Sequence, residues 1–290
     1  MAAVCTQGVD TGFVALGYTK VAVLGIVQGI TELLPISSTA HMRLVPSLLG
    51  WQDPGSAFSA AMQLAALAAV VSFFWTDVRN LAANSLQAIA RRQFNDRHLR
   101  FALWIVLATI PIGIVGLLMA PLLNTCNSPL RNMSVIGWAC LGMGFLLGVA
   151  EVRARHRRTI DNASFVDALL IGVAQVGALI PGVSRSGSTL TAALALGFKR
   201  DEAARLSFLL GLPAIALAGL KEMWELYRIH LDPTGWSILL VGLIVASISA
   251  FLAIWGLMRV LQKFSTWPFV IYRTALGTVI LVGVATGWLA

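Results

Sequence analysis

The sequence predicts an all-α integral membrane protein with six transmembrane helices and two re-entrant helical hairpins in an inverted repeat. Of its 290 residues, 58% are hydrophobic and only 12% are charged, whereas about 25% of a soluble domain is charged. Seven stretches carry no charged side chain, and two broken apolar segments resemble each other. Because a helix needs roughly 20 apolar residues to cross a bilayer, the chain spans a membrane several times as a single domain, residues 1–290.

Six segments are apolar and long enough for full crossings: 57–76, 101–122, 133–150, 203–222, 236–257 and 269–289. Two further apolar segments contain helix-breaking or charged residues. Residues 21–49 are interrupted by Glu32, Pro35, His41 and Arg43, and residues 168–198 by Pro181, Gly182 and Arg185. We expect each to form two half-helices that enter the membrane and return. Irregular backbone at that depth has to be buried in protein or to line a water-filled cavity.

The basic residues support this layout. If the six crossings alternate and both broken segments re-enter, fourteen Lys and Arg residues fall on one side and five on the other. The fourteen are Arg79, Arg91, Arg92, Arg97, Arg100, Arg153, Arg155, Arg157, Arg158, Lys199, Arg200, Arg205, Arg259 and Lys263. Since positive residues collect in cytoplasmic loops, this side is the cytoplasm and both termini lie outside. The same bias accounts for the net charge of +8 without a nucleic-acid partner.

The two broken segments form an internal repeat. Gly25-Ile-Val-Gln28 recurs as Gly172-Val-Ala-Gln175. In both segments a break that contains leucine and proline is followed by serines and then by an apolar span. By the count of sides, the first hairpin enters from outside and the second from the cytoplasm. The repeat halves therefore run over about 20–150 and 165–290. Inverted repeats with broken helices place their site near the midplane, at half-helix ends.

The first broken segment contains an intramembrane carboxylate. Gln28 and Glu32 are four residues apart and share one helix face. A charged residue inside a membrane segment is costly and usually marks a pathway or a site. A purely structural reading is that Glu32 only neutralises a buried arginine.

Polar residues follow the break in this segment. Pro35 ends the first half-helix, so that Ser37, Ser38 and Thr39 stand where the next helix begins. Such residues cap helix N-termini, and a helix N-terminus also binds anions. His41 lies three residues after Ser38 and can reach the same cavity to transfer a proton, or it can be an interfacial residue.

The second broken segment repeats the arrangement and adds a guanidinium. Ser184 and Ser186 can cap the new helix or donate to a ligand, and Gly187 lets the backbone approach a ligand closely. The planar fork of Arg185 suits two-pronged binding of phosphate, although it can also neutralise Glu32. Together the two segments predict a midplane site for a diphosphate with a lipid tail. The Glu32 and Gln28 side chains favour a divalent cation with oxygen ligands.

These motifs resemble the undecaprenyl-diphosphate phosphatase family, the bacitracin-resistance type of bacterial inner-membrane enzyme. The family signatures read (Glu/Gln)-x-x-x-Glu, Pro-x-Ser-Ser-x-x-His and Pro-Gly-x-Ser-Arg-Ser-Gly. In this chain they stand as Gln28-Gly-Ile-Thr-Glu32, Pro35-Ile-Ser37-Ser38-Thr-Ala-His41 and Pro181-Gly-Val-Ser184-Arg185-Ser186-Gly187. The resemblance runs along the whole chain, and two long motifs about 150 residues apart make it specific.

The resemblance implies hydrolysis of undecaprenyl diphosphate to the monophosphate, which recycles the lipid carrier for cell-wall synthesis and confers bacitracin resistance. It also implies dependence on Mg²⁺ or Ca²⁺ and a site open to the periplasm. The partners expected are the polyprenyl diphosphate lipid and the bilayer, and the sequence is compatible with a homodimer.

The roles of individual residues follow from the same resemblance. Glu32 holds the metal or acts as the base, and Gln28 assists it, although some family members have Glu at this position. Ser38 is the first candidate for the nucleophile and Ser37 the second. His41 activates the nucleophile or protonates the leaving group. Arg185 clamps the phosphates with Ser184 and Ser186.

Two questions stay open at this stage. Either Ser38 forms a phosphoryl-enzyme, or water attacks directly while the metal and Arg185 stabilise the developing charge. The alternative function is a transporter or flippase of a polyprenyl phosphate lipid, because inverted repeats with broken helices are common in secondary transporters.

Overall fold

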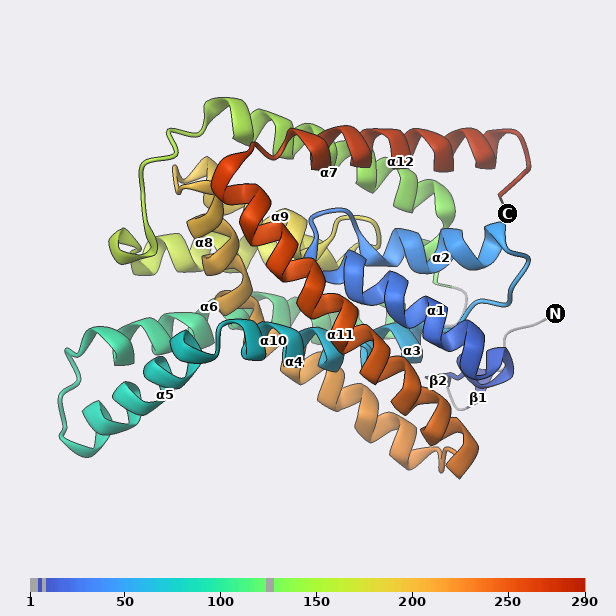
Figure 1. The fold of residues 1–290 in the computed structure, drawn as a ribbon, viewed down its shortest axis with the longest axis horizontal. Helices are drawn as coiled ribbons and strands as arrows, with labels where there is room; N and C mark the ends of the chain where they lie inside the picture. The colour runs from blue at the N-terminus through green and yellow to red at the C-terminus, as the bar shows by residue number, and fades with distance from the viewer. Residues whose placement is uncertain (1–4, 7–8, 124–127, 290) are drawn as a thin grey trace.

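The computed structural model describes residues 5–6, 9–123 and 128–289, and most of them are helical (Figure 1). Two short strands, β1 (Cys5–Thr6) and β2 (Val9–Asp10), pair antiparallel before the first helix. The α-helices are α1 (Phe13–Leu33), α2 (Ser38–Leu48), α3 (Ser56–Ala61), α4 (Gln63–Phe73), α5 (Trp75–Ala90), α6 (Arg97–Leu123), α7 (Met133–Arg153), α8 (Phe165–Val176), α9 (Arg185–Ala195), α10 (Arg200–Arg228), α11 (Pro233–Lys263) and α12 (Trp267–Ala285). The 3-10 helices are η1 (Pro129–Arg131), η2 (Ile160–Asn162) and η3 (Gly177–Leu179).

Seven helices in the described part of the chain are long and apolar enough to cross a membrane, judged by length and composition. Six of them coincide with the predicted crossings. The helices α3 and α4, which Met62 separates, together form one of these six. The seventh is α1, of which only residues 21–33 had been expected to be helical, as a half-helix. It is longer because it already begins at Phe13 and continues through a kink at Gly17, where φ is +72°. Glu32 does not shorten it, since this residue lies in its last turn.

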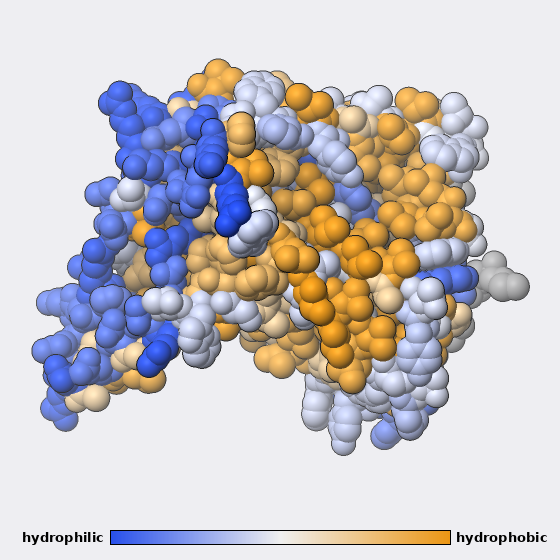
Figure 2. Space-filling model, viewed as in Figure 1, coloured by the Kyte–Doolittle hydropathy of each residue, from blue (hydrophilic) through white to orange (hydrophobic). Residues whose placement is uncertain are grey.

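The connection between the predicted crossings 57–76 and 101–122 is not a simple loop, because it contains most of the helix α5. Its many polar and basic residues face outwards, and Figure 2 shows hydrophilic residues gathered at the end of the molecule where α5 and the α7–α8 connection lie. Elsewhere in this view the surface is apolar over α11 and α12. Large side chains such as Leu117, Phe145 and Leu252 are exposed, as expected for a surface that faces lipid.

The two broken segments lie in the middle of the fold. The helix pairs α1/α2 and α8/α9 sit between α7 and α12 on one side and α4, α10 and α11 on the other (Figure 1). The largest apolar core cluster includes Leu33 at the end of α1, Leu190 and Leu194 in α9, and Phe208 in α10. Both helix breaks are therefore held inside protein, where irregular backbone can be satisfied.

Candidate functional site

Each helix pair is interrupted in the same way. After α1, Leu34 is extended, and Ser37 then adopts a left-handed conformation with φ +73° before α2 begins. Before α9, Ser184 adopts the same unusual conformation with φ +70°. Left-handed φ values are uncommon outside glycine and concentrate at functional sites.

The two strained serines cap the helices that follow them. Ser37 Oγ accepts a hydrogen bond from the N–H of Ala40 at 3.3 Å, and Ser184 Oγ accepts one from the N–H of Gly187 at 3.2 Å. Ser37 is completely buried, so the structure uses its hydroxyl as a cap. Two helix N-termini thus begin side by side, a favourable environment for an anion.

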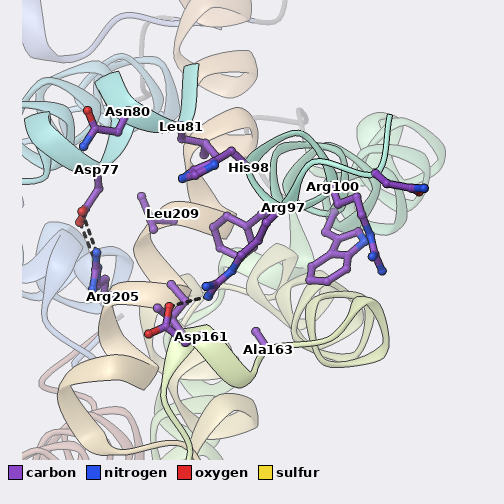
Figure 3. Close-up of a pocket in the computed structure, with 14 residues that line it drawn as sticks. Asp77, Asn80, Leu81, Arg97, His98, Arg100, Asp161, Ala163, Arg205 and Leu209 are labelled. Atoms are coloured by element: carbon purple, nitrogen blue, oxygen red, sulfur yellow. Dashed lines mark hydrogen bonds and ion pairs between the residues drawn. The ribbon is translucent and has the colours of Figure 1, made fainter. Parts of the chain in front are cut away.

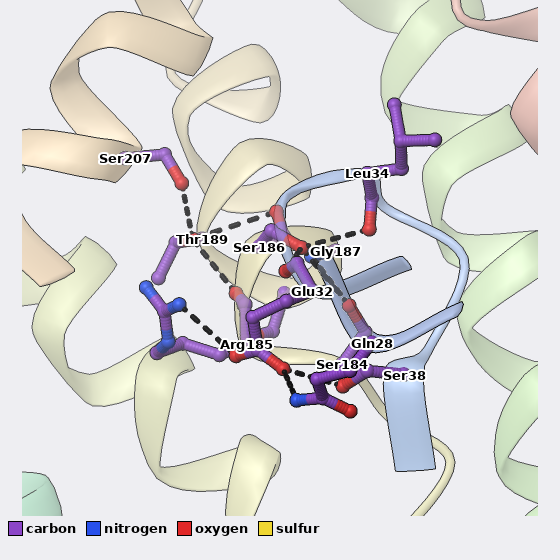
Figure 4. A network of polar contacts seen from close by, with 11 residues as sticks. Gln28, Glu32, Leu34, Ser38, Ser184, Arg185, Ser186, Gly187, Thr189 and Ser207 are labelled. Carbon is purple, nitrogen blue, oxygen red and sulfur yellow. Dashed lines mark hydrogen bonds and ion pairs between the residues drawn. The ribbon is translucent and has the colours of Figure 1, made fainter. Parts of the chain in front are cut away.

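The two breaks are tied to each other. Ser186 Oγ lies 3.2 Å from the carbonyl oxygen of Glu32 and 3.0 Å from that of Leu34, and Ser184 Oγ lies 3.1 Å from Ser186 Oγ. These contacts join the start of α9 to the end of α1 (Figure 4). The predicted phosphate-binding hydroxyl of Ser186 therefore also contacts backbone carbonyls at the break.

A fully buried arginine holds both breaks, and sequence reasoning had not found it. Arg273 in α12 donates from Nη1 to the carbonyl oxygen of Pro35 at 3.1 Å, and from Nη2 to those of Gly182 at 2.8 Å and Val183 at 3.0 Å. The sequence analysis had suggested no site role for Arg273. The space beside Gly187 is taken by this residue, since a Cβ added there would lie 2.9 Å from Arg273 Nη1.

Glu32 is the centre of the polar network in Figure 4. Its Oε2 accepts hydrogen bonds from Gln28 Nε2 at 2.9 Å and from Ser38 Oγ at 2.6 Å. Its Oε1 faces Arg185 Nη2 at 3.3 Å, an ion pair between the first and second helix pairs. Glu32 is only 9% exposed, and Arg185 lies opposite it as a positively charged partner in this buried site.

His41 lies on the other side of the break. Its Nδ1 is 2.7 Å from the carbonyl oxygen of Ser37, and its Nε2 is 2.7 Å from the hydroxyl of Tyr272, whose ring stacks on the imidazole. Because a carbonyl only accepts, Nδ1 carries the proton and Nε2 accepts from Tyr272 in the neutral imidazole. His41 therefore contacts neither Glu32 nor Ser38 through these nitrogens. Thr39 is half-buried and makes no side-chain hydrogen bond with described residues.

Some buried polar atoms of this network have no partner among the described residues. They include Gln28 Oε1 and Arg185 Nη1. Nearly all buried polar groups are hydrogen-bonded to protein or ordered water in native proteins, so these atoms are available to a water or a ligand. Gln28 Oε1, the Glu32 carboxylate and the Ser38 hydroxyl are oxygen donors of the kind that Mg²⁺ and Ca²⁺ prefer, while Arg185 Nη1 suits an anion. The donor set fits a divalent cation completed by substrate phosphate.

A cavity of about 410 Å³ lies at the hydrophilic end of the molecule, between α5, α6 and α10 (Figure 3). Two of its arginines are paired with acids: Arg205 Nη2 lies 2.6 Å from Asp77 Oδ1, and Arg97 Nη2 lies 2.5 Å from Asp161 Oδ1. None of the predicted site residues lines it. The two pairs join α10 to α5 and α6 to η2.

Comparison with known proteins agrees with the motifs. The family model "Bacitracin resistance protein BacA" matches residues 21–279. The chain is 74% identical over 263 residues to "Undecaprenyl-diphosphatase 2" of Mesorhizobium japonicum, covering 91% of this chain and 100% of that protein. It is 47% identical over 268 residues to "Undecaprenyl-diphosphatase" of Synechococcus elongatus, covering 92% and 93% of the two chains. The resemblance read from the two motifs is confirmed, and the chain belongs to the bacitracin resistance protein BacA family.

Proposed function

We propose that this protein hydrolyses undecaprenyl diphosphate to undecaprenyl phosphate and inorganic phosphate, and so recycles the lipid carrier for cell-wall synthesis and confers bacitracin resistance. The relatives named undecaprenyl-diphosphatase are similar over nearly their whole length. The observation that carries the proposal is the Glu32–Arg185 pair, which joins a carboxylate to a phosphate-binding guanidinium at two helix N-termini.

The hydrogen bond between Ser38 and Glu32 supports Ser38 as the nucleophile and Glu32 as its base. Ser38 Oγ attacks the terminal phosphorus and gives its proton to Glu32, while the bridging P–O bond breaks and undecaprenyl phosphate leaves with that proton. Glu32, ionised again, takes a proton from the water that attacks the phosphoserine and returns it to Ser38 Oγ as the P–Oγ bond breaks and inorganic phosphate is released. A general base has to lie within about 2.6–3.2 Å of the proton donor, and the observed 2.6 Å meets this condition.

Arg185, Ser184, Ser186 and Gly187 belong to the part of the site that would hold the phosphates, together with Ser37 and Thr39 at the start of α2. The N–H groups of both helix starts and the guanidinium favour the negative charge of a diphosphate. Both ring nitrogens of His41 have partners, so its Nε2 would have to leave Tyr272 before it could exchange a proton with a phosphate oxygen or the solvent.

Glu32 and Gln28 would hold a divalent cation, Mg²⁺ or Ca²⁺. When bound, such a cation neutralises charge on the phosphoryl oxygens. Gln28 would contribute through its Oε1, the atom without a partner. An amide is a neutral ligand, so Glu32 supplies the only negative charge that these two residues offer the cation.

The membrane arrangement that fits this site has six crossing helices and two re-entrant pairs, α1/α2 and α8/α9, in the plasma membrane with the site open to the periplasm. The packing supports an inverted repeat: α1 packs on α11 as α8 packs on α6, and α4 packs on α11 as α10 packs on α6. In a background without Cys5, Cys126 and Cys140, a membrane-impermeant thiol reagent added to intact cells should label Arg228→Cys and spare Arg91→Cys. Labelling of both, or of Arg91→Cys alone, contradicts this topology.

The direct test measures phosphate release from C55 diphosphate by the purified protein in detergent, with and without a chelator. We expect turnover that the chelator stops and that Mg²⁺ or Ca²⁺ restores. Glu32→Gln should lower turnover about 10³-fold because it removes the base. The control is Glu225→Gln, which only breaks a partly exposed pair with Lys221. Binding without release, together with lipid movement between leaflets of liposomes, would instead favour the transporter.

A further inference from the structure

Gln175 in α8 is a buried amide that no contact in the described structure explains. It is 1% exposed, and neither its Nε2 nor its Oε1 has a hydrogen-bond partner. It stands nine residues before the strained Ser184, as Gln28 stands nine residues before the strained Ser37. Gln175 is therefore the second-half counterpart of Gln28.

The amide of Gln175 lies close to the free side of Arg185. A Cβ added to Gly211 of α10 would lie 2.4 Å from Arg185 Nη1 and 3.7 Å from Gln175 Oε1. Both atoms are thus within a few ångström of one point, yet they are not hydrogen-bonded to each other. Arg185 Nη1 is likewise buried without a described partner, while Nη2 of the same guanidinium faces Glu32.

Gly211 leaves room for the guanidinium of Arg185 itself. Any side chain at position 211 would occupy the place where Arg185 Nη1 now lies. The result is a group of three unsatisfied polar atoms between α8, α9 and α10: two donors, Arg185 Nη1 and Gln175 Nε2, and one acceptor, Gln175 Oε1. In native proteins such buried atoms are nearly always paired with protein, water or ligand.

The chemistry of these atoms selects a protonated phosphate. A guanidinium N–H and an amide N–H bind non-bridging oxygens of an anion. The amide oxygen accepts from a hydroxyl, which a hydrogen phosphate carries and a fully ionised phosphate lacks. A carboxylate ligand would satisfy the donors but leave the amide oxygen without a partner.

We propose that Gln175 and Arg185 Nη1, on the side of the guanidinium that faces Gly211, form the subsite for the phosphate that is released as product. This inference rests on the proposed function in one respect, namely that the phosphate comes from hydrolysis of the diphosphate lipid. Arg185 then holds Glu32 with one nitrogen and the departing phosphate with the other. Gln175 is a substrate-binding residue and takes no part in the proton transfers of Ser38 and Glu32.

The test compares the wild type with Gln175→Leu and Gln175→Glu in detergent. Inorganic phosphate is added, and both its inhibition constant and its protection against thermal unfolding are measured. Loss of a hydrogen bond to a charged ligand predicts an inhibition constant raised roughly tenfold or more in Gln175→Leu. In Gln175→Glu a carboxylate competes with phosphate for Arg185, so protection by phosphate should be lost.

The stability of the variants separates binding from a structural role. Gln175→Leu removes polar atoms that have no protein partner, so its Tm without phosphate should equal or exceed that of the wild type. Ser207→Ala is the control, because Ser207 is buried in α10 near this region and bonds only to Thr189 among the described residues. It should leave phosphate inhibition unchanged.

The proposal is overturned if both Gln175 variants keep wild-type phosphate inhibition and protection, or if Gln175→Leu is strongly destabilised without phosphate. Thermal protection by inorganic phosphate does not require turnover. If the wild type hydrolyses no C55 diphosphate, the proposed function fails, whereas the protection measurements still decide whether Gln175 binds phosphate.

Discussion

Ser38 Oγ donates a 2.6 Å hydrogen bond to Glu32 Oε2 across the break that separates α1 from α2. The two residues are six positions apart, so an unbroken helix would not place them together on one face. Pro35 and the left-handed Ser37 reverse the chain and bring them into contact. The strained backbone at Ser37 therefore places the proposed nucleophile, Ser38, against its proposed base, Glu32.

This alignment predicts a trapped intermediate. A rapid quench of the enzyme with labelled C55 diphosphate should yield phosphoserine at position 38. Ser38→Ala should abolish the label and lower turnover about 10³-fold. Ser47→Ala serves as the control, since Ser47 bonds only to a backbone carbonyl in α2. Repeated absence of label at quench times shorter than one turnover would favour direct attack by water.

The ion pair between Glu32 and Arg185 predicts that lysine cannot replace Arg185. Lysine keeps the charge but loses the fork that faces Glu32 with one nitrogen and the free side with the other. We expect Arg185→Lys to lower kcat/KM about 10²-fold, a loss typical of one donor to a phosphoryl oxygen. The check is steady-state phosphate release at saturating Mg²⁺, with Arg200→Lys as the control because Arg200 pairs with Glu151 away from the site. Equal losses in the two variants would refute a specific role.

The buried Arg273 predicts a large effect on stability. Arg273→Met leaves the carbonyls of Pro35, Gly182 and Val183 without their donor, and each buried unsatisfied group costs about 1–3 kcal/mol. We expect a loss of several kcal/mol, measured as a lower Tm in detergent. The matched control is Arg259→Met, since Arg259 lies on the surface of α11 over the ring of Trp255. A Tm for Arg273→Met within two degrees of the wild type would contradict this role.

Much of the site could be predicted from the sequence because its chemistry is local to two motifs. Glu32, Ser38 and Arg185 are polar residues in apolar segments, and each is expensive enough there to reveal itself. The breaks could be predicted because Pro35 and Pro181 disrupt a helix and polar residues follow each of them. The meeting of Glu32 with Arg185 was expected as one reading of these residues, and the structure contains that pair.

What the sequence could not reveal depends on backbone atoms and on orientation. The partners of Arg273 are carbonyl oxygens, which every residue carries, so no pattern of side chains identifies them. Tyr272 contacts His41 only because α12 turns that face toward α2. The length of α1 and the helical state of α5 were missed for a different reason, since composition alone does not fix where a polar or weakly apolar segment becomes helical.

Two glycines in equivalent positions of the repeat give a last prediction. A Cβ added to Gly172 of α8 would lie 2.2 Å from the carbonyl oxygen of Ala108 in α6, and one added to Gly25 of α1 would lie 2.9 Å from that of Gly242 in α11. Small residues let membrane helices approach this closely. Gly142 in α7 has open space around it and offers a matched control.

Alanine should therefore destabilise the protein at both packed positions, by about 1–3 kcal/mol as overpacking does. The effect should be greater for Gly172→Ala, because the contact there is shorter. Gly142→Ala, also in the interior of a helix, should raise Tm or leave it unchanged, since alanine is the better helix former. If Gly25→Ala and Gly172→Ala behave like Gly142→Ala in thermal unfolding, the close packing of α1 on α11 and of α8 on α6 is wrong, and with it the packing evidence for the inverted repeat.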